Sequence, residues 1–212
     1  MKKKNLIKYW NRFYKNGLIK KESSFARFVY KKIKNKKGNF LDIGCGNGRD
    51  SFFFNKKGFN VTGIDISEKA IKKNSKHKFK NLHFIKFDIG KNKIKRKYDV
   101  IYCRFFLHAI DKNLENKLIT LIKSVKKNKT LVFFEFRNNK DKIFEKFTGK
   151  AHNTMHEYEK GHFRRIIDPK IFNKKFLNKT KSKIIYKKSA KNLSIFKNDN
   201  PNLSRIIFKF HD

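Results

Sequence analysis

The segment that most constrains the fold is FLDIGCGNGRD, at residues 40–50. Residues 40–43 have the character of a short buried strand, and three glycines then follow in the pattern G-x-G-x-G. Glycine tolerates positive φ and has no Cβ, so a ligand can lie directly against such a turn. Residues 49–57 have helical character. A strand, a glycine turn and a helix N-terminus together predict a nucleotide-type site with amide groups directed at the ligand.

The spacing around the glycines indicates which ligand. The dinucleotide fingerprint is G-x-G-x-x-G, whereas here the glycines are closer together and Asp42 stands two residues before the first of them. A carboxylate at that position repels a pyrophosphate but can hold an ammonium group. The pattern therefore favours a cationic amino-acid nucleoside over NAD. An ordinary tight turn between a strand and a helix is the alternative interpretation.

Two further strands also end at aspartates. Residues 60–65 predict a second strand ending at Asp65, which lies 23 positions after Asp42, a distance that suits one βαβ unit. An acid at the tip of the second strand suits a pair of ribose hydroxyls. Residues 82–87 predict a third strand, followed at once by Asp88. Loops alone hardly explain three successive strands that each end at an aspartate.

With these residues the chain resembles the class I S-adenosylmethionine-dependent methyltransferases. The first three motifs of that family match LDIGCGNG, VTGIDIS and FIKFDIG, and the resemblance covers residues 36–137. The run YCRFFLHAI, at residues 102–110, is similar to the small-molecule and glycan-associated branch near the tellurite-resistance and thiopurine methyltransferases. Adenine and glutamine N-methyltransferases usually carry Asn/Asp-Pro-Pro-aromatic at this strand, which this chain lacks.

The order of elements predicts an α/β fold. We expect a doubly wound, Rossmann-like sheet of seven strands, mostly parallel, with an antiparallel C-terminal hairpin at its edge and helices on both faces. We expect one domain over residues 1–212. Its parts are an N-terminal helical cap (1–35), a cofactor-binding core (36–137), a substrate-side insertion (138–182) and a C-terminal hairpin (183–212). Within the insertion we expect a helix at 138–147 and a polar loop at 148–167.

Composition bounds the partners and the compartment. The formal charge is +39, from 56 Lys and Arg against 17 Asp and Glu, which suggests a nucleic acid or an anionic surface. Lysine dominates this charge and is spread along the chain, so a bias toward AT-rich codons is the favoured explanation. We find no apolar run long enough for a membrane span, no secretory signal and only two cysteines, so we expect a cytoplasmic protein.

The cofactor is expected at the carboxyl ends of the strands, where ligands of such sheets bind. A basic residue after the fourth strand, Arg104, would contact a carboxylate or form a salt bridge to Asp99 or Glu135. Aromatic residues of the N-terminal cap, Trp10 and Tyr14, would cover the cofactor, as the resemblance implies. The expected cofactor-binding residues are Trp10, Asp42, Gly44, Cys45, Gly46, Asn47, Asp65, Ile66, Asp88, Ile89 and Arg104.

The acceptor site is expected beside the fifth strand and in the loop after it. Arginine is suited to bidentate recognition of phosphate or carboxylate, and this chain contains few arginines. The expected substrate-binding residues are Tyr102, Arg137, Arg164 and Arg165, and the expected catalytic residues are His108, Arg137 and His162. A structural histidine at His108 and a solvated basic loop at 161–165 are the alternatives. We expect no metal site, because His152, His156, Glu157 and His162 lack a clear ligand set.

The sequence therefore predicts methyl transfer from S-adenosylmethionine to a small, anionic acceptor. Phosphate-, carboxylate- and sugar-linked groups all fit, including those of surface-polysaccharide synthesis. Two alternatives remain: an RNA methyltransferase, supported by the charge, and an RNA-binding module on a methyltransferase scaffold that has lost catalysis. The three intact motifs argue against the second alternative.

Overall fold

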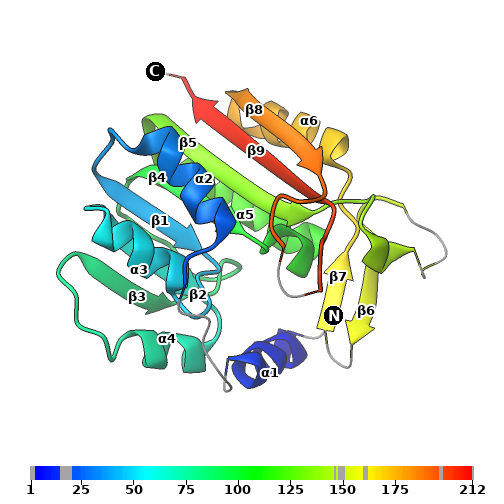
Figure 1. Ribbon diagram of the computed structural model, residues 1–212, viewed down its shortest axis with the longest axis horizontal. Helices are drawn as coiled ribbons and strands as arrows, with labels where there is room; N and C mark the ends of the chain where they lie inside the picture. The colour runs from blue at the N-terminus through cyan, green and yellow to red at the C-terminus, as the bar shows by residue number, and fades with distance from the viewer. Residues whose placement is uncertain are drawn as a thin grey trace.

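A seven-stranded sheet forms the centre of the molecule (Figure 1). The computed structural model describes residues 3–14, 21–145, 147, 151–159, 162–195 and 198–211. The strands of the sheet are β1 (Asn39–Ile43), β2 (Asn60–Asp65), β3 (Leu82–Lys86), β4 (Tyr98–Arg104), β5 (Lys126–Arg137), β8 (Ser182–Ala190) and β9 (Leu203–Phe210). Their spatial order is β3-β2-β1-β4-β5-β9-β8.

The first five strands run parallel, and β9 is antiparallel to both of its neighbours, β5 and β8. The strand order reverses direction beside β1, since β2 and β3 lie on one side of it and β4 and β5 on the other. In such sheets the crevice at this switch point is where ligands bind. The expected doubly wound sheet with an antiparallel C-terminal edge is confirmed.

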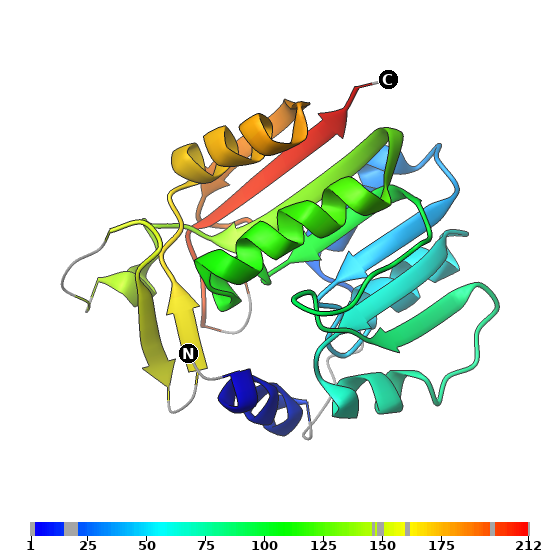
Figure 2. The ribbon, with the colours of Figure 1, turned by 180° about the vertical axis from the view of Figure 1, so that it is seen from behind.

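Helices cover both faces of the sheet. On one face lie α2 (Ser24–Ile33) and α3 (Arg49–Lys56), and on the other α5 (Lys112–Val125) and α6 (Pro169–Thr180) (Figure 2). Along β4 the side chains alternate, because Val100 and Tyr102 pack toward α2 and α3 whereas Ile101 and Cys103 pack toward α5. The helix α4 (Glu68–Asn74) packs against β2 and β3 at the sheet edge.

Four helices begin at capping side chains. The side chains of Ser23, Ser67, Asp111 and Asp168 each accept a hydrogen bond from a backbone N–H in the first turn of α2, α4, α5 and α6 respectively. These caps satisfy amides that have no partner inside the helix, and each contributes about 1 kcal/mol. The helix starts are thus set by local sequence.

Segment 138–147 differs from the expected helix. Within its described residues only a single 3-10 turn, η2 (Lys142–Phe144), forms. The side chains of Asn138 and Asp141 accept hydrogen bonds from the backbone N–H groups two residues further on. Such local bonds compete with a helical backbone, so the prediction of a helix here is wrong for a physical reason.

The expected polar loop at 148–167 contains a two-stranded hairpin. It consists of β6 (Met155–Glu159) and β7 (His162–Arg165), which pair antiparallel as a separate small sheet. The N-terminal helix α1 (Lys3–Phe13) lies between this hairpin and α4, away from the faces of the main sheet (Figure 1). No helix in the described ranges is long and apolar enough to cross a membrane.

Candidate active site

A cavity of about 360 Å³ opens at the carboxyl edge of the parallel strands. The ends of β1, β2, β4 and β5 contribute to its wall, together with the segment after β3, helix α1 and strand β7. The predicted site residues on this wall are Trp10, Gly44, Cys45, Asn47, Asp65, Ile66, Asp88, Ile89, Arg104, Arg137 and Arg164. The structure therefore brings together most of the residues that the sequence selects, from segments far apart along the chain.

The glycine turn after β1 forms the floor of the cavity. The N–H groups of Gly44 and Cys45 both donate to the carbonyl oxygen of Ile64, which ties the turn to β2. Gly44 and Gly46 have φ values of +74° and +51°. A Cβ at Gly44 would lie 2.5 Å from the Phe106 ring, so only glycine fits there.

Asp65 stands at the tip of β2 and is fixed by two backbone donors. Its Oδ2 accepts the N–H of Gly46 at 2.9 Å, and its Oδ1 accepts the N–H of Ser67 at 2.8 Å. Burial raises the pKa of this carboxyl above its usual value, while the two N–H donors lower it. A carboxylate held in one orientation on a cavity wall can accept hydrogen bonds from neighbouring hydroxyls of a ligand.

Asp88 follows β3 at the next strand end along the same edge. Its Oδ1 accepts the N–H of Gly90 at 2.9 Å, so its side chain is held in a local turn. Ile89 beside it also lines the cavity, as does Leu114 of α5. An apolar slot next to a carboxylate is suited to a flat heterocycle with an exocyclic amine.

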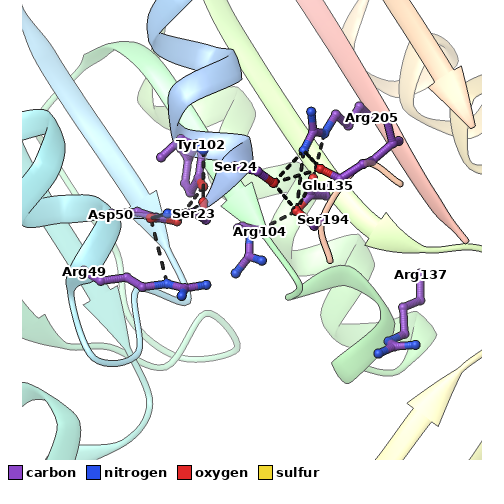
Figure 3. A network of polar contacts seen from close by, with 12 residues as sticks. Ser23, Ser24, Arg49, Asp50, Tyr102, Arg104, Glu135, Arg137, Ser194 and Arg205 are labelled. Carbon is purple, nitrogen blue, oxygen red and sulfur yellow. Dashed lines mark hydrogen bonds and ion pairs between the residues drawn. The ribbon is translucent and has the colours of Figure 1, made fainter. Parts of the chain in front are cut away.

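Two arginines, Arg49 and Arg104, line the cavity near the glycine turn (Figure 3). Arg104, the last residue of β4, donates from Nε to Oε1 of Glu135 at 3.0 Å. Glu135 is fully buried and also accepts from Nε of Arg205 at 2.7 Å. The salt bridge to Glu135 that the sequence allows for Arg104 is present, and Arg104 lines the cavity as well.

Arg137 and Arg164 also line the cavity. Arg137, at the end of β5, donates to Asp141 at 2.9 Å and also pairs with Asp199. The guanidinium carbon of Arg164 lies 5.9 Å from the ring centroid of Trp10. Because two carboxylates already hold Arg137, the charge around Arg137 is less positive than the arginines alone suggest.

Helix α1 closes one side of the cavity with aromatic side chains. Trp10 and Tyr14 stack with ring centroids 5.9 Å apart, and both line the cavity. A Cβ at Gly46 would lie 2.3 Å from the Tyr14 hydroxyl, so this hydroxyl lies directly over the glycine turn. Burial and the neighbouring Asp65 raise the Tyr14 pKa, which keeps the phenol protonated. That these rings cover a cofactor stays a prediction.

Asp42 and Gly46, two predicted cofactor residues, are not on the cavity wall. Asp42 is buried beneath the glycine turn, where the Ser51 hydroxyl donates to its Oδ2 at 2.6 Å. Burial raises the pKa of Asp42 to about 8. We therefore assign Asp42 to holding α3 through Ser51 rather than to direct contact with an ammonium group.

Two predicted substrate residues also lie in the protein interior. The Tyr102 hydroxyl donates to Asp50 at 2.7 Å, and its ring packs in the core against Phe25. Arg165 is fully buried and pairs with Glu115. Alternation along β7 sends Arg165 to the opposite side from Arg164. We remove Tyr102 and Arg165 from the acceptor contacts.

The two predicted catalytic histidines are not on the cavity wall either. Nδ1 of His108 accepts the Arg137 N–H at 3.1 Å, so the proton of the neutral ring is on Nε2 and the ring cannot serve as a base. Burial and nearby Arg164 hold its pKa well below the usual value. His162 stacks on Tyr9 at 4.4 Å, and burial lowers its pKa to about 3. We assign both histidines to packing.

Several wall residues are absent from the predicted site, among them Phe106, Arg49 and Asp199. Phe106 packs on the glycine turn, Arg49 begins α3, and Asp199 comes from the β8–β9 connection. Arg49 carries a sequence signal, since an arginine directly follows the glycine turn in a chain with few arginines. The role of Asp199 depends on a partner 62 residues away, which no local pattern reveals. No cluster of potential metal ligands occurs among the described residues.

Comparison with known proteins identifies the family. A family model described as a methyltransferase domain matches residues 34–196. The chain belongs to this methyltransferase-domain family. The predicted resemblance to methyltransferases is confirmed, while the branch within the class stays a prediction. The match includes the glycine turn, the three strand-end aspartates and the β6–β7 hairpin.

Individual relatives of this methyltransferase-domain protein are distant. A ubiquinone biosynthesis O-methyltransferase from Rickettsia bellii is 24% identical over 127 residues, covering 56% of this chain and 52% of the relative. The chain thus spans about half the length of the first curated relatives it matches. A methyltransferase structure from Methanosarcina mazei has a TM-score of 0.72 and 18% identity, covering 86% of this chain and 97% of that one. One from Clostridium acetobutylicum has a TM-score of 0.67 and 16% identity, covering 89% and 92%. At these identities the structures establish the shared fold alone.

Proposed function

We propose that this protein transfers a methyl group from S-adenosylmethionine to a small acceptor that carries an anionic group. The observation that carries the proposal is Asp65, held by the N–H groups of Gly46 and Ser67 on the wall of a cavity at the strand ends. In this orientation its carboxylate is available to both ribose hydroxyls of the cofactor. The family and the fold support the same assignment.

The cofactor would lie along the strand ends. With the ribose at Asp65, the adenine would enter the apolar slot formed by Ile89 and Leu114, with Asp88 near its exocyclic amine. The amino-acid end would then pass over the glycine turn toward β4. Methyl transfer from a sulfonium is an in-line displacement, so the protein mainly has to align the acceptor and exclude water. The aromatic wall of α1 serves that exclusion.

The acceptor would bind at the end of the cavity that carries Arg137 and Arg164. Arg164 carries a planar guanidinium, which lies over the Trp10 ring of α1. Pairing of β7 with β6 fixes its backbone. Arg137 and Asp199 present a donor and an acceptor side by side, which suits a group with both hydroxyl and anionic oxygens. Phosphate-, carboxylate- and sugar-linked acceptors all satisfy this chemistry. The curated relatives are O-methyltransferases by name, so hydroxyl acceptors belong among the candidates.

A methyl-transfer assay with labelled S-adenosylmethionine tests the proposal. The panel contains sugar phosphates, hydroxylated carboxylic acids, their uncharged counterparts and tRNA. We expect transfer to an anionic small molecule, and Arg164→Met should raise its KM or lower kcat/KM at least tenfold while cofactor affinity changes less than twofold. Arg27→Met, which alters an exposed arginine outside the cavity, is the matched control. Transfer only to uncharged acceptors, or only to tRNA, contradicts the proposed acceptor class.

A further inference from the structure

One stripe of helix α1 runs from inside the cavity to the molecular surface. Leu6, Trp10 and Phe13 recur at the i, i+4, i+7 spacing of one helix face, and all three line the cavity. Leu6 is buried, whereas Phe13 is 55% exposed. The Phe13 ring is held by its neighbours, with ring centroids 5.5 Å from Trp10 and 5.1 Å from Tyr14. An apolar stripe thus leads out of the cavity and ends in an exposed ring at the cavity rim.

Helices α1 and α4 together form one edge of the molecule. Both views show the two helices along this edge (Figures 1 and 2). Asn11 of α1 connects them, because its side-chain oxygen accepts the hydroxyl of Ser67 at 2.8 Å, where α4 begins. We call residues 3–14 and 66–80 the α1–α4 edge.

The α1–α4 edge combines exposed cations with exposed aromatic rings. Its single acidic residue in the sequence, Glu68, is already paired with two lysines. Lysine alone does not single out this edge, because α6 and β8 are also rich in it. Among the phenylalanines that the structure describes, however, the two that are exposed are Phe13 and Phe79, and both belong to this edge. Its exposed cations include Lys8, Arg12, Lys69, Lys76, Lys78 and Lys80.

We propose that the α1–α4 edge docks on the surface of an anionic lipid bilayer. Surfaces of this kind combine cations, which are attracted to anionic headgroups, with aromatic rings, which lie at the level of the headgroups. The stripe of Leu6, Trp10 and Phe13 favours a bilayer over RNA, because RNA has no apolar chain that would follow the stripe into the cavity. The docking goes beyond the proposed function and does not depend on it.

Docking by this edge would turn the cavity rim toward the headgroups. The guanidinium carbon of Arg164 lies 5.9 Å from the ring centroid of Trp10, the middle residue of the stripe. An amphiphile with an anionic head and an apolar chain would therefore meet a cation and an apolar path in the same cavity. Lipid-borne anions thus join the candidate acceptors, and this step, unlike the docking, rests on the proposed function.

Vesicle co-sedimentation with the full chain tests the docking. The vesicles contain either phosphatidylcholine alone or phosphatidylcholine with about 30% phosphatidylglycerol, a content that gives an anionic surface. We expect binding to the mixed vesicles to be at least tenfold tighter than to phosphatidylcholine. The triple variant Lys76→Gln, Lys78→Gln, Lys80→Gln should weaken binding to the mixed vesicles at least tenfold, because three cations leave the docked surface.

Strand β8 supplies matched controls, since it also presents exposed lysines and an exposed apolar residue. The triple variant Lys183→Gln, Lys187→Gln, Lys188→Gln removes the same charge from β8 and should weaken binding less than threefold. Phe13→Ser should weaken binding about fivefold, because the ring leaves the interface. Ile185→Ser, at a β8 residue that is 47% exposed, should change it less than twofold. Thermal unfolding establishes that each variant is folded.

Trp10 reports which face meets the bilayer, because it is the single tryptophan of the chain. Anionic vesicles with acyl chains brominated near the headgroup should quench its fluorescence. The same vesicles without bromine should bind equally well and leave the fluorescence unquenched. Phe13→Ser should reduce the quenching along with the binding.

Several results would overturn the docking, and none of them concerns methyl transfer, which the labelled assay tests separately. Equal losses in the two lysine triple variants would mean that diffuse charge alone attracts the vesicles. Binding without quenching of Trp10 would place the contact on another face. Absence of binding to the mixed vesicles, together with binding to an RNA oligonucleotide that Phe13→Ser weakens, would make the α1–α4 edge an RNA surface; absence of both would leave it an ordinary solvated face.

Discussion

At the scale of single residues, Asp65 carries two tasks with one carboxylate. One oxygen holds the glycine turn through Gly46 and the other holds the start of α4 through Ser67. The same carboxylate is the proposed partner of the ribose. A ligand bound there would therefore be connected to both the turn and the helix, so ligand binding should stiffen this end of the sheet.

Asp65→Asn should weaken S-adenosylhomocysteine binding by about 2 kcal/mol, the scale for a hydrogen bond to a charged group. The amide keeps one acceptor oxygen but loses the charge and one of the two acceptors. Calorimetry measures the change, and thermal unfolding establishes that the variant is folded. The control is Asp99→Asn, which makes the same charge change at Asp99, whose carboxylate accepts the N–H of Asn39 at the start of β1. Equal affinity in the Asp65 variant and the wild type would refute the ribose assignment.

Asp42 predicts a pH dependence of stability in the ligand-free protein. Its folded pKa is about 8, above the usual value of 3.8, so between these pH values the folded state binds one proton more than the unfolded state. Stability contributed by this proton is complete below about pH 4 and is lost as the pH rises through about 8. Asp42→Asn keeps an acceptor for Ser51 and removes the titration. We measure the free energy of unfolding in urea between pH 5 and 8. As the pH rises, this free energy should fall less in the variant than in the wild type, by roughly 1 kcal/mol per pH unit. Parallel pH profiles would contradict this.

The residue scale also explains what the sequence could predict. Gly44, Asp65 and Asp88 were predictable because each is defined by its own strand end and the turn after it. The interior positions of Tyr102 and His162 were not, because the direction of a side chain depends on which elements pack around it. Arg49 directly follows the glycine turn in the sequence. Its place beside Arg104 on the cavity wall depends on how α3 and β4 pack, which no local pattern reveals.

At the scale of elements, a buried ionic group connects the hairpin to the main fold. Arg165 of β7 and Lys175 of α6 both donate to Glu115 of α5, and Glu115 is fully buried. Arg165 also donates to the carbonyl oxygen of Leu107 at the start of η1 (Leu107–Ala109). The contact fixes β7 and thereby the backbone of Arg164 beside it, so a residue outside the cavity determines where an acceptor-site residue stands.

Arg165→Met should destabilise the protein by about 3–5 kcal/mol, because it leaves the buried Glu115 carboxylate with Lys175 as its single cationic partner. Chemical denaturation measures this loss. Arg164→Met, one position away on the other side of the strand, should cost less than about 1 kcal/mol, since its guanidinium lies on the cavity wall. If the Arg164 variant were the less stable of the two, the assignment of Arg165 to the fold and of Arg164 to the acceptor would be reversed.

The elements that the sequence failed to predict share one property. The hairpin β6–β7 and the 3-10 turn η2 lie in polar segments without the apolar alternation that identifies a core strand. Their structure comes from partners distant in sequence, such as Glu115 for Arg165 and Asp141 for the N–H of Asn202. The sheet itself was predictable because its strands carry continuous apolar runs between turn residues.

At the scale of the whole molecule, a formal charge of +39 coexists with a cavity whose wall carries both acidic and basic side chains. The cavity contains carboxylates of Asp65, Asp88 and Asp199 beside its arginines, and α1 covers one side of it. By contrast, exposed lysines occur on elements throughout the chain, including α2, the 76–80 segment and β8. A positive charge spread over the surface attracts any polyanion, but it does not create a specific site.

We therefore expect tRNA to bind without being methylated. Binding measured by fluorescence anisotropy should be detectable at 50 mM salt and should weaken by orders of magnitude at 200 mM, because it arises from counterion release. A duplex DNA of the same length should behave similarly, since neither would be recognised by its bases. In the labelled-methyl assay tRNA should accept no label at either salt concentration, while the small anionic acceptor should do so at both. Label incorporated into tRNA at 200 mM salt, at a single nucleotide position, would instead establish RNA as the substrate, and the lysines would then be part of the recognition surface.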